Sequence, residues 1–88
     1  MNIAFEASFA RDLKRVRDKQ LLRRVQQVIE SVREAATIDD VTGVKKMQGY
    51  DTLYRLRLGD YRIGMEVADD RMIFVRFLHR KVIYRYFP

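Results

Sequence analysis

The chain has 88 residues, with 18 Lys or Arg against 12 Asp or Glu, so its formal net charge is +6 and its sequence pI is near 10.0. This length predicts one domain, residues 1–88, with a single modest core. Cysteine is absent and histidine occurs once. This excludes disulfides, thiolate catalysis and zinc sites built from Cys or His, and we expect no metal and no other cofactor.

The basic excess lies in the second half of the chain. Residues 1–40 contain eight basic and seven acidic side chains, whereas residues 41–88 contain ten and five. A basic balance favours an anionic partner such as nucleic acid, an acidic protein or a membrane surface. No segment approaches the roughly 20 apolar residues that span a bilayer, and no signal-like run begins the chain. We therefore expect a cytoplasmic protein without a membrane partner.

The first half of the chain predicts a strand and two helices. Residues 2–6 alternate apolar and polar side chains, which indicates a short strand. A helix is expected from there to about Arg17, with Ser8 as its N-cap. A longer helix is expected after Asp18, because apolar residues recur at three- and four-residue spacing over residues 21–32.

The second half predicts a loop and three strands. Residues 37–51 contain two glycines and form a connecting loop, with a brief strand or turn around residues 44–47. Three strands follow, separated by Gly59-Asp60 and Asp69-Asp70, which fit tight turns, and the last strand continues into the tail HRKVIYRYFP. The order βααβββ predicts an α+β fold, an antiparallel sheet with the helices on one face.

The stretch TLYRLRLGDYRIGMEV concentrates positive charge on one side of a predicted hairpin. Strand alternation turns the apolar residues toward the core, whereas Arg55 and Arg57 share the open face with Arg62, Gly64 and Glu66. Gly64 leaves that face without a side chain, so another group can approach closely. Arginine is a common choice on a solvated face, but neighbouring cations repel, and Glu66 alone offsets them. The pattern therefore indicates a bound polyanion.

YRLRLGDYRIGMEV, followed by FLHRKVIYRYF, resembles the RelE/ParE superfamily of toxin–antitoxin toxins, specifically its RelE branch. The resemblance covers nearly the whole chain and includes VKKMQG before the hairpin and the terminal HRxxxY pattern. It implies a type II toxin that enters the ribosomal A site and cuts mRNA there. The cut needs no metal, because the ribose 2′-hydroxyl attacks the adjacent phosphate.

The resemblance also implies roles for individual residues. Arg55 and Arg57 match two basic positions, commonly lysines, on the first hairpin strand, and Arg62 matches an arginine on the second. Arg80 and Tyr84 match an arginine and a tyrosine near the C-terminus. Guanidinium groups at Arg62 and Arg80 suit stabilisation of the transition state, Arg55 suits a backbone phosphate, and Tyr84 suits stacking on a base.

The general base is the open question, because Arg57 stands where a lysine is common and arginine does not lose its proton. Glu66 and His79 are the titratable candidates, with a base-free mechanism as the alternative. Alternation places Glu66 on the face of Arg62 and turns His79 to the opposite side, unless a bulge intervenes. A half-buried or surface histidine is the simpler interpretation of His79.

The expected partners are the ribosome with its mRNA, and a cognate antitoxin whose acidic, amphipathic segment folds on the basic face. Lys45 and Lys46 are either solvated loop charges or RNA contacts. Two alternatives share the fold: a ParE-like inhibitor of DNA gyrase that cleaves no RNA, and a non-catalytic RNA-binding module.

Overall fold

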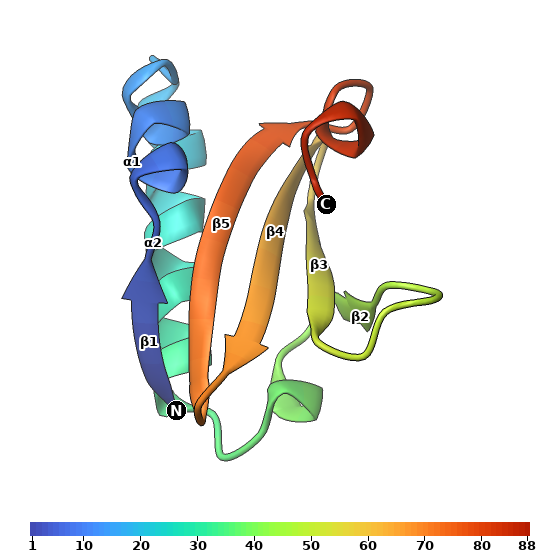
Figure 1. Cartoon of the computed structure of the whole chain (residues 1–88). Helices are drawn as coiled ribbons and strands as arrows, with labels where there is room; N and C mark the ends of the chain where they lie inside the picture. Colours follow the sequence, from blue (N-terminus) through green and yellow to red (C-terminus); the bar gives the residue numbers. More distant parts are fainter.

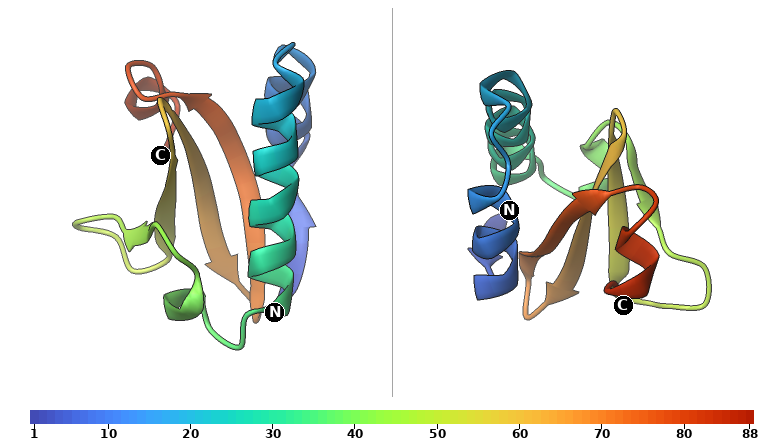
Figure 2. Two further views of the ribbon diagram at one scale, coloured as in Figure 1. Left: turned by 180° about the vertical axis from the view of Figure 1, so that it is seen from behind. Right: turned by 90° about the horizontal axis from the view of Figure 1, so that it is seen from above.

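Two helices and a five-stranded sheet make up the molecule, and the computed structural model describes all of residues 1–88. The helices cover one face of the sheet and the C-terminal segment lies on the other (Figures 1 and 2). This confirms the predicted α+β class. Neither helix is long and apolar enough to cross a membrane. The elements are β1 (Asn2–Phe5), α1 (Ala7–Lys14), α2 (Lys19–Glu34), η1 (Ile38–Asp40), β2 (Val44–Lys46), β3 (Leu53–Leu58), β4 (Tyr61–Ala68), β5 (Arg71–His79) and η2 (Ile83–Arg85), where η is a 3-10 helix.

The sheet has the strand order β1-β5-β4-β3-β2. The pairs from β2 to β5 are antiparallel, as expected, but β1 pairs with β5 in parallel. The prediction of a wholly antiparallel sheet is therefore wrong at this edge. Most of the chain separates β1 from β5, so no tight turn dictates their relative direction. The brief strand expected in the loop is β2, which forms the opposite edge.

The helices begin close to the predicted positions. Asp18 caps α2, since its carboxylate accepts hydrogen bonds from two amides of the first turn, at 3.0 and 3.1 Å. Ser8 does not cap α1, which begins after Glu6. Its hydroxyl instead donates to the carbonyl of Val75 at 2.6 Å, because the outer edge of β5 needs partners there.

The core lies between the helices and the sheet. Every second residue of a strand turns its side chain toward the helices, and these side chains form the part of the core that the sheet contributes. One bulge interrupts the alternation: Gly64 lies opposite Arg76 and Met65 opposite Phe74, so Val75 is the extra residue of β5. Residues on both sides of this bulge can then turn toward the helices. The largest fully buried side chains are those of Phe9, Val25, Val32, Leu56, Ile63, Met65, Met72, Phe74, Phe77 and Ile83.

The sequence suggested that the last strand continues into the C-terminal tail, but the structure shows that it does not. After β5 ends at His79, the chain turns, forms η2 and runs back over the sheet face that the helices leave free (Figure 1). Phe87 is only 3% exposed, and a Cβ added to Gly64 would lie 2.7 Å from its ring. The close approach predicted at Gly64 therefore exists, and the group that approaches is the chain's own tail.

Replacing Gly64 by alanine should force Phe87 away from the sheet. We expect the free energy of unfolding, measured with urea, to fall by about 2 kcal/mol, as for other overpacked sites. Combining Gly64→Ala with Phe87→Val should cost less than the sum of the two single changes, because the smaller side chain leaves room for the methyl group. Strictly additive losses would contradict this contact.

Candidate functional site

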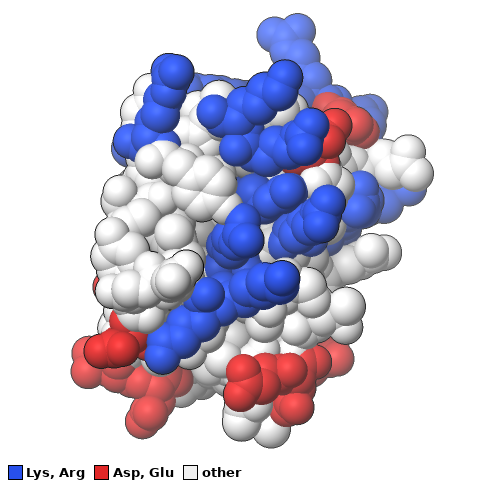
Figure 3. Space-filling view, turned by 90° about the vertical axis from the view of Figure 1, so that its right-hand side faces the viewer, with Lys and Arg blue, Asp and Glu red and all other residues white.

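Basic side chains of β2, β3 and β4 line a hollow of about 290 Å³ on the sheet face opposite the helices. No acidic or apolar residue lines it. Figure 3 shows a continuous band of Lys and Arg across this side of the molecule, with most Asp and Glu gathered at its lower end. We call this site the cationic hollow; its lining residues are Gly43, Lys45, Arg55, Arg57 and Arg62.

The strand register brings these cations together. Lys45 lies opposite Arg55 in the β2–β3 pair, and Arg57 lies opposite Arg62 in the β3–β4 pair. Like charges at facing positions repel. None of the four takes part in the three ion pairs of the chain, which all involve other arginines. The repulsion is thus uncompensated, and an anion with several charges would relieve it.

Arg62 is held more firmly than its neighbours in the hollow. It is 8% exposed, and its NH1 donates to the carbonyls of Gly59 at 2.7 Å and Tyr61 at 2.8 Å. Gly59 lies in the turn between β3 and β4, and Tyr61 is the first residue of β4. The guanidinium is therefore oriented before any ligand arrives, which is the condition for strong electrostatic stabilisation of developing charge.

Tyr84 extends the site from the tail. It lies in η2 and is 53% exposed; the NH1 of Arg55 donates to its hydroxyl, with the guanidinium carbon 5.8 Å from the ring centroid. A second hollow of about 410 Å³ lies beside the first, and the two share Lys45 and Arg55. The remaining lining residues of this second hollow are Lys46, Met47, Gln48 and Tyr84.

Arg80 does not line the cationic hollow. Its backbone amide donates to the carbonyl of Asp60 at 2.8 Å, and its Nε is 3.8 Å from the Asp60 carboxylate. The side chain is 53% exposed. Arg80 thus sits at the same turn whose Gly59 carbonyl orients Arg62, with its charge partly offset.

The sequence of the whole chain has clear relatives. A family model described as the ParE toxin of a type II toxin-antitoxin system, parDE, matches residues 3–84. The chain is 43% identical over 89 aligned positions, the full length of both chains, to Toxin RelE3 of Methanocaldococcus jannaschii. The chain belongs to the RelE/ParE superfamily of type II toxin–antitoxin toxins. The resemblance read from the hairpin and tail is therefore confirmed, and the chain is a RelE-like toxin.

Solved structures agree with this RelE/ParE assignment. A chain of the RelB-RelE antitoxin-toxin complex from Methanococcus jannaschii superposes with a TM-score of 0.81 at 41% identity, covering 97% of this chain and 99% of that one. A chain of the archaeal RelE-RelB complex from Pyrococcus horikoshii OT3 has a TM-score of 0.74 at 22% identity, with coverage of 92% and 96%. The second match supports the fold alone.

Glu66 and His79, the two titratable candidates for the general base, do not line the cationic hollow. His79 faces the helices, as alternation predicted: its ring lies edge-on to Tyr61 at 5.6 Å, and its Nδ1 accepts from the amide of Lys81 at 3.1 Å. Glu66 lies four residues along β4 from Arg62, about 13 Å at the rise of an extended strand, and lines neither hollow. No cluster of His, Asp or Glu suited to a metal ion occurs in the chain.

Two features of this toxin were not foreseen from the sequence. Lys45 was named as a loop charge or an RNA contact, but its place in the cationic hollow beside Arg57 and Arg62 was not predicted, because a three-residue strand is too short for its alternation to be recognised. The tail folds back through Ile83 and Phe87, both buried. Their four-residue spacing is the one sequence signal that pointed to a folded tail.

Proposed function

We propose that this toxin is a ribosome-dependent mRNA endoribonuclease, an mRNA interferase that inhibits translation. The observation that carries the proposal is the cationic hollow, where four basic side chains meet without an acidic partner. Its size and charge suit a phosphate of an RNA strand. The adjoining hollow offers Tyr84 as an aromatic plane for a neighbouring base.

The proposed reaction is a transfer within the RNA. The ribose 2′-oxygen bonds to the adjacent phosphorus and the bond from phosphorus to the 5′-oxygen breaks, leaving a 2′,3′-cyclic phosphate and a 5′-hydroxyl. The proton of the 2′-hydroxyl passes to a base, and the leaving oxygen takes a proton from water. Arg57 and Arg62 stabilise the negative charge that builds on the phosphorane oxygens.

Lys45 is the proposed general base. Among the side chains that line the cationic hollow, the other three cations are arginines, which stay protonated. A lysine can give up its proton and then accept one from a hydroxyl. Lys45 lies on β2 opposite Arg55, and it lines the same hollow as Arg57 and Arg62. This proposal replaces Glu66 and His79 as the preferred bases.

The remaining basic residues bind the message around the cut. Arg55 and Lys46 border the hollow that contains Tyr84, so they suit the phosphates on either side of a base stacked there. Arg80, at the β3–β4 turn, suits a phosphate next to the scissile one. These contacts supply position and affinity more than rate.

We further propose a cognate antitoxin of RelB type, since the Methanococcus jannaschii structure at 41% identity is an antitoxin–toxin complex. Its binding segment would be acidic and amphipathic, so that its carboxylates pair with the cations of the hollow and exclude RNA from it.

One parallel assay tests this function against inhibition of DNA gyrase, the candidate favoured by the match to a ParE toxin model. The purified protein is added to ribosomes translating a defined message, whose new 5′ ends are mapped, and to gyrase in a supercoiling assay. We expect cuts in register with codons, no cuts in the same message without ribosomes, and normal supercoiling. Intact message together with blocked supercoiling would overturn the proposal.

A further inference from the structure

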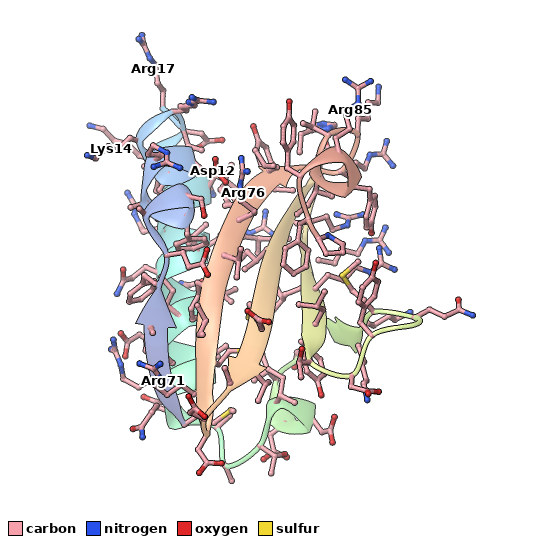
Figure 4. All side chains as sticks on the ribbon, in the orientation of Figure 1. Asp12, Lys14, Arg17, Arg71, Arg76 and Arg85 are labelled. Atoms are coloured by element: carbon pink, nitrogen blue, oxygen red, sulfur yellow. The ribbon has the colours of Figure 1, made fainter.

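Asp12 is a buried acidic side chain that the cationic hollow does not use. It lies on α1 and is 4% exposed. Its carboxylate accepts two hydrogen bonds from Arg76, from Nε at 2.8 Å and NH2 at 3.1 Å, and a third from the amide of Phe77 at 2.9 Å. Figure 4 shows the two side chains meeting between α1 and β5. A carboxylate with this many partners is fixed in place.

The position of Asp12 follows from the sheet. Pairing between β1 and β5 stops at Phe74, so the outer edge of β5 beyond that residue lacks a neighbouring strand. Helix α1 takes the place of the strand there, and Asp12 accepts from the free amide of Phe77. This explains why an acidic residue lies three positions after the buried Phe9 on the apolar side of α1.

Arg76 connects this edge to the opposite face. It lies across from Gly64 in the β4–β5 pair, on the face that the tail covers, and its guanidinium carbon is 5.2 Å from the ring centroid of Tyr86. One guanidinium therefore contacts a carboxylate on α1 and an aromatic ring of the tail. The contact with Tyr86 is a cation–π interaction in the usual distance range.

We propose that Asp12, Arg76 and Tyr86 are positioning residues that hold the tail so that Tyr84 stays beside the cationic hollow. Tyr84 is two residues from Tyr86 and is itself bonded to Arg55. The effect on Tyr84 rests on the function proposed above, whereas the effect on the tail does not.

Charge explains why the tail needs this support. The tail carries Arg80, Lys81 and Arg85, and its Tyr84 contacts Arg55 of the hollow, so the cations of the tail and of the hollow repel each other. Arg80 has an acidic partner, but the ion pairs of the chain include neither Lys81 nor Arg85. Asp12 neutralises Arg76, which lets a further cation lie against the tail without adding to the repulsion.

Amide hydrogen exchange tests the positioning directly. Tyr86 is 55% exposed, so Tyr86→Leu removes the ring over Arg76 without opening the core. We expect the amides of Arg85, Tyr86 and Phe87, which bond within the tail, to exchange about fivefold faster, while amides of β3 and β4 stay as they were. Tyr86→Phe should retain protection, and Tyr50→Leu, a change at another exposed tyrosine, should have no effect on the tail. Unchanged tail exchange, or equal acceleration throughout the sheet, would overturn the inference.

Asp12→Asn is a second test variant. Asp12 is buried at α1, away from the hollow, so an effect of this change on cleavage cannot come from a lost contact with RNA. We expect the tail amides to exchange faster in this variant too. Tyr86→Leu and Asp12→Asn should also each lower message cleavage about fivefold, and this loss should disappear in a Tyr84→Ala background. Undiminished losses in that background would contradict positioning through Tyr84. If the wild-type protein cuts no message, the proposed function fails, and the exchange measurement still decides whether the tail is held in this way.

Discussion

Arg62→Ala is expected to lower kcat/KM for message cleavage by about a thousandfold. The guanidinium is buried at the cationic hollow and oriented by two carbonyl oxygens, so it is poised to donate to the phosphorane oxygens without reorganising. Losing one such donor typically costs between a hundredfold and a thousandfold, and Arg62 can offer two. Single-turnover cleavage by programmed ribosomes measures the effect.

Two comparisons separate charge, geometry and folding in this experiment. Arg62→Lys keeps the charge but not the planar guanidinium, and we expect it to recover only a small part of the lost rate. Arg71→Ala removes an exposed arginine at the far end of β5 and should cut normally. A folded Arg62→Ala protein, verified by urea unfolding, that cuts within threefold of the wild type would refute the assigned role.

Lys45→Arg is expected to have the second large effect. It should lower kcat by about a hundredfold and change KM little. The substitution keeps the positive charge in the cationic hollow and removes the ability to lose a proton there. General-base catalysis typically contributes a hundredfold or more. Lys46→Arg, on the same short strand but outside the cationic hollow, is the matched control and should be nearly silent.

A lysine at position 57 offers a further check on the base. Arg57 lines the same hollow, so adding Arg57→Lys to Lys45→Arg restores a proton-accepting side chain at constant charge. Arg57→Lys also gives up a guanidinium that stabilises the phosphorane oxygens, so we expect only a partial recovery, about tenfold over Lys45→Arg alone. If Lys45→Arg cuts at the wild-type rate, then proton transfer does not depend on Lys45.

Local patterns account for what the sequence predicted well. The alternation of Leu56 and Leu58 with Arg55 and Arg57 depends only on the pleat of one strand, so it placed the arginines on a common face. The apolar spacing of α2 and its cap at Asp18 are equally local, and both were found.

Long-range pairing accounts for what the sequence did not predict. The parallel direction of β1, the bulge at Val75 and the return of the tail onto Gly64 depend on contacts between distant segments, which no local periodicity encodes. For the same reason, the sequence did not show where two residues of the site lie. Lys45 reaches the cationic hollow through the pairing of a three-residue strand, and Tyr84 reaches its edge through the folded tail.

The central claim is that the cationic hollow promotes attack by a ribose 2′-hydroxyl, and a message with one 2′-deoxynucleotide tests it most directly. Ribosomes are programmed with two messages that differ only by the missing hydroxyl on the nucleotide 5′ to the mapped cut. We predict that the all-ribose message is cut and ends in a 2′,3′-cyclic phosphate, while the deoxy-substituted message stays intact at that position. Equal cutting of both messages would contradict the account.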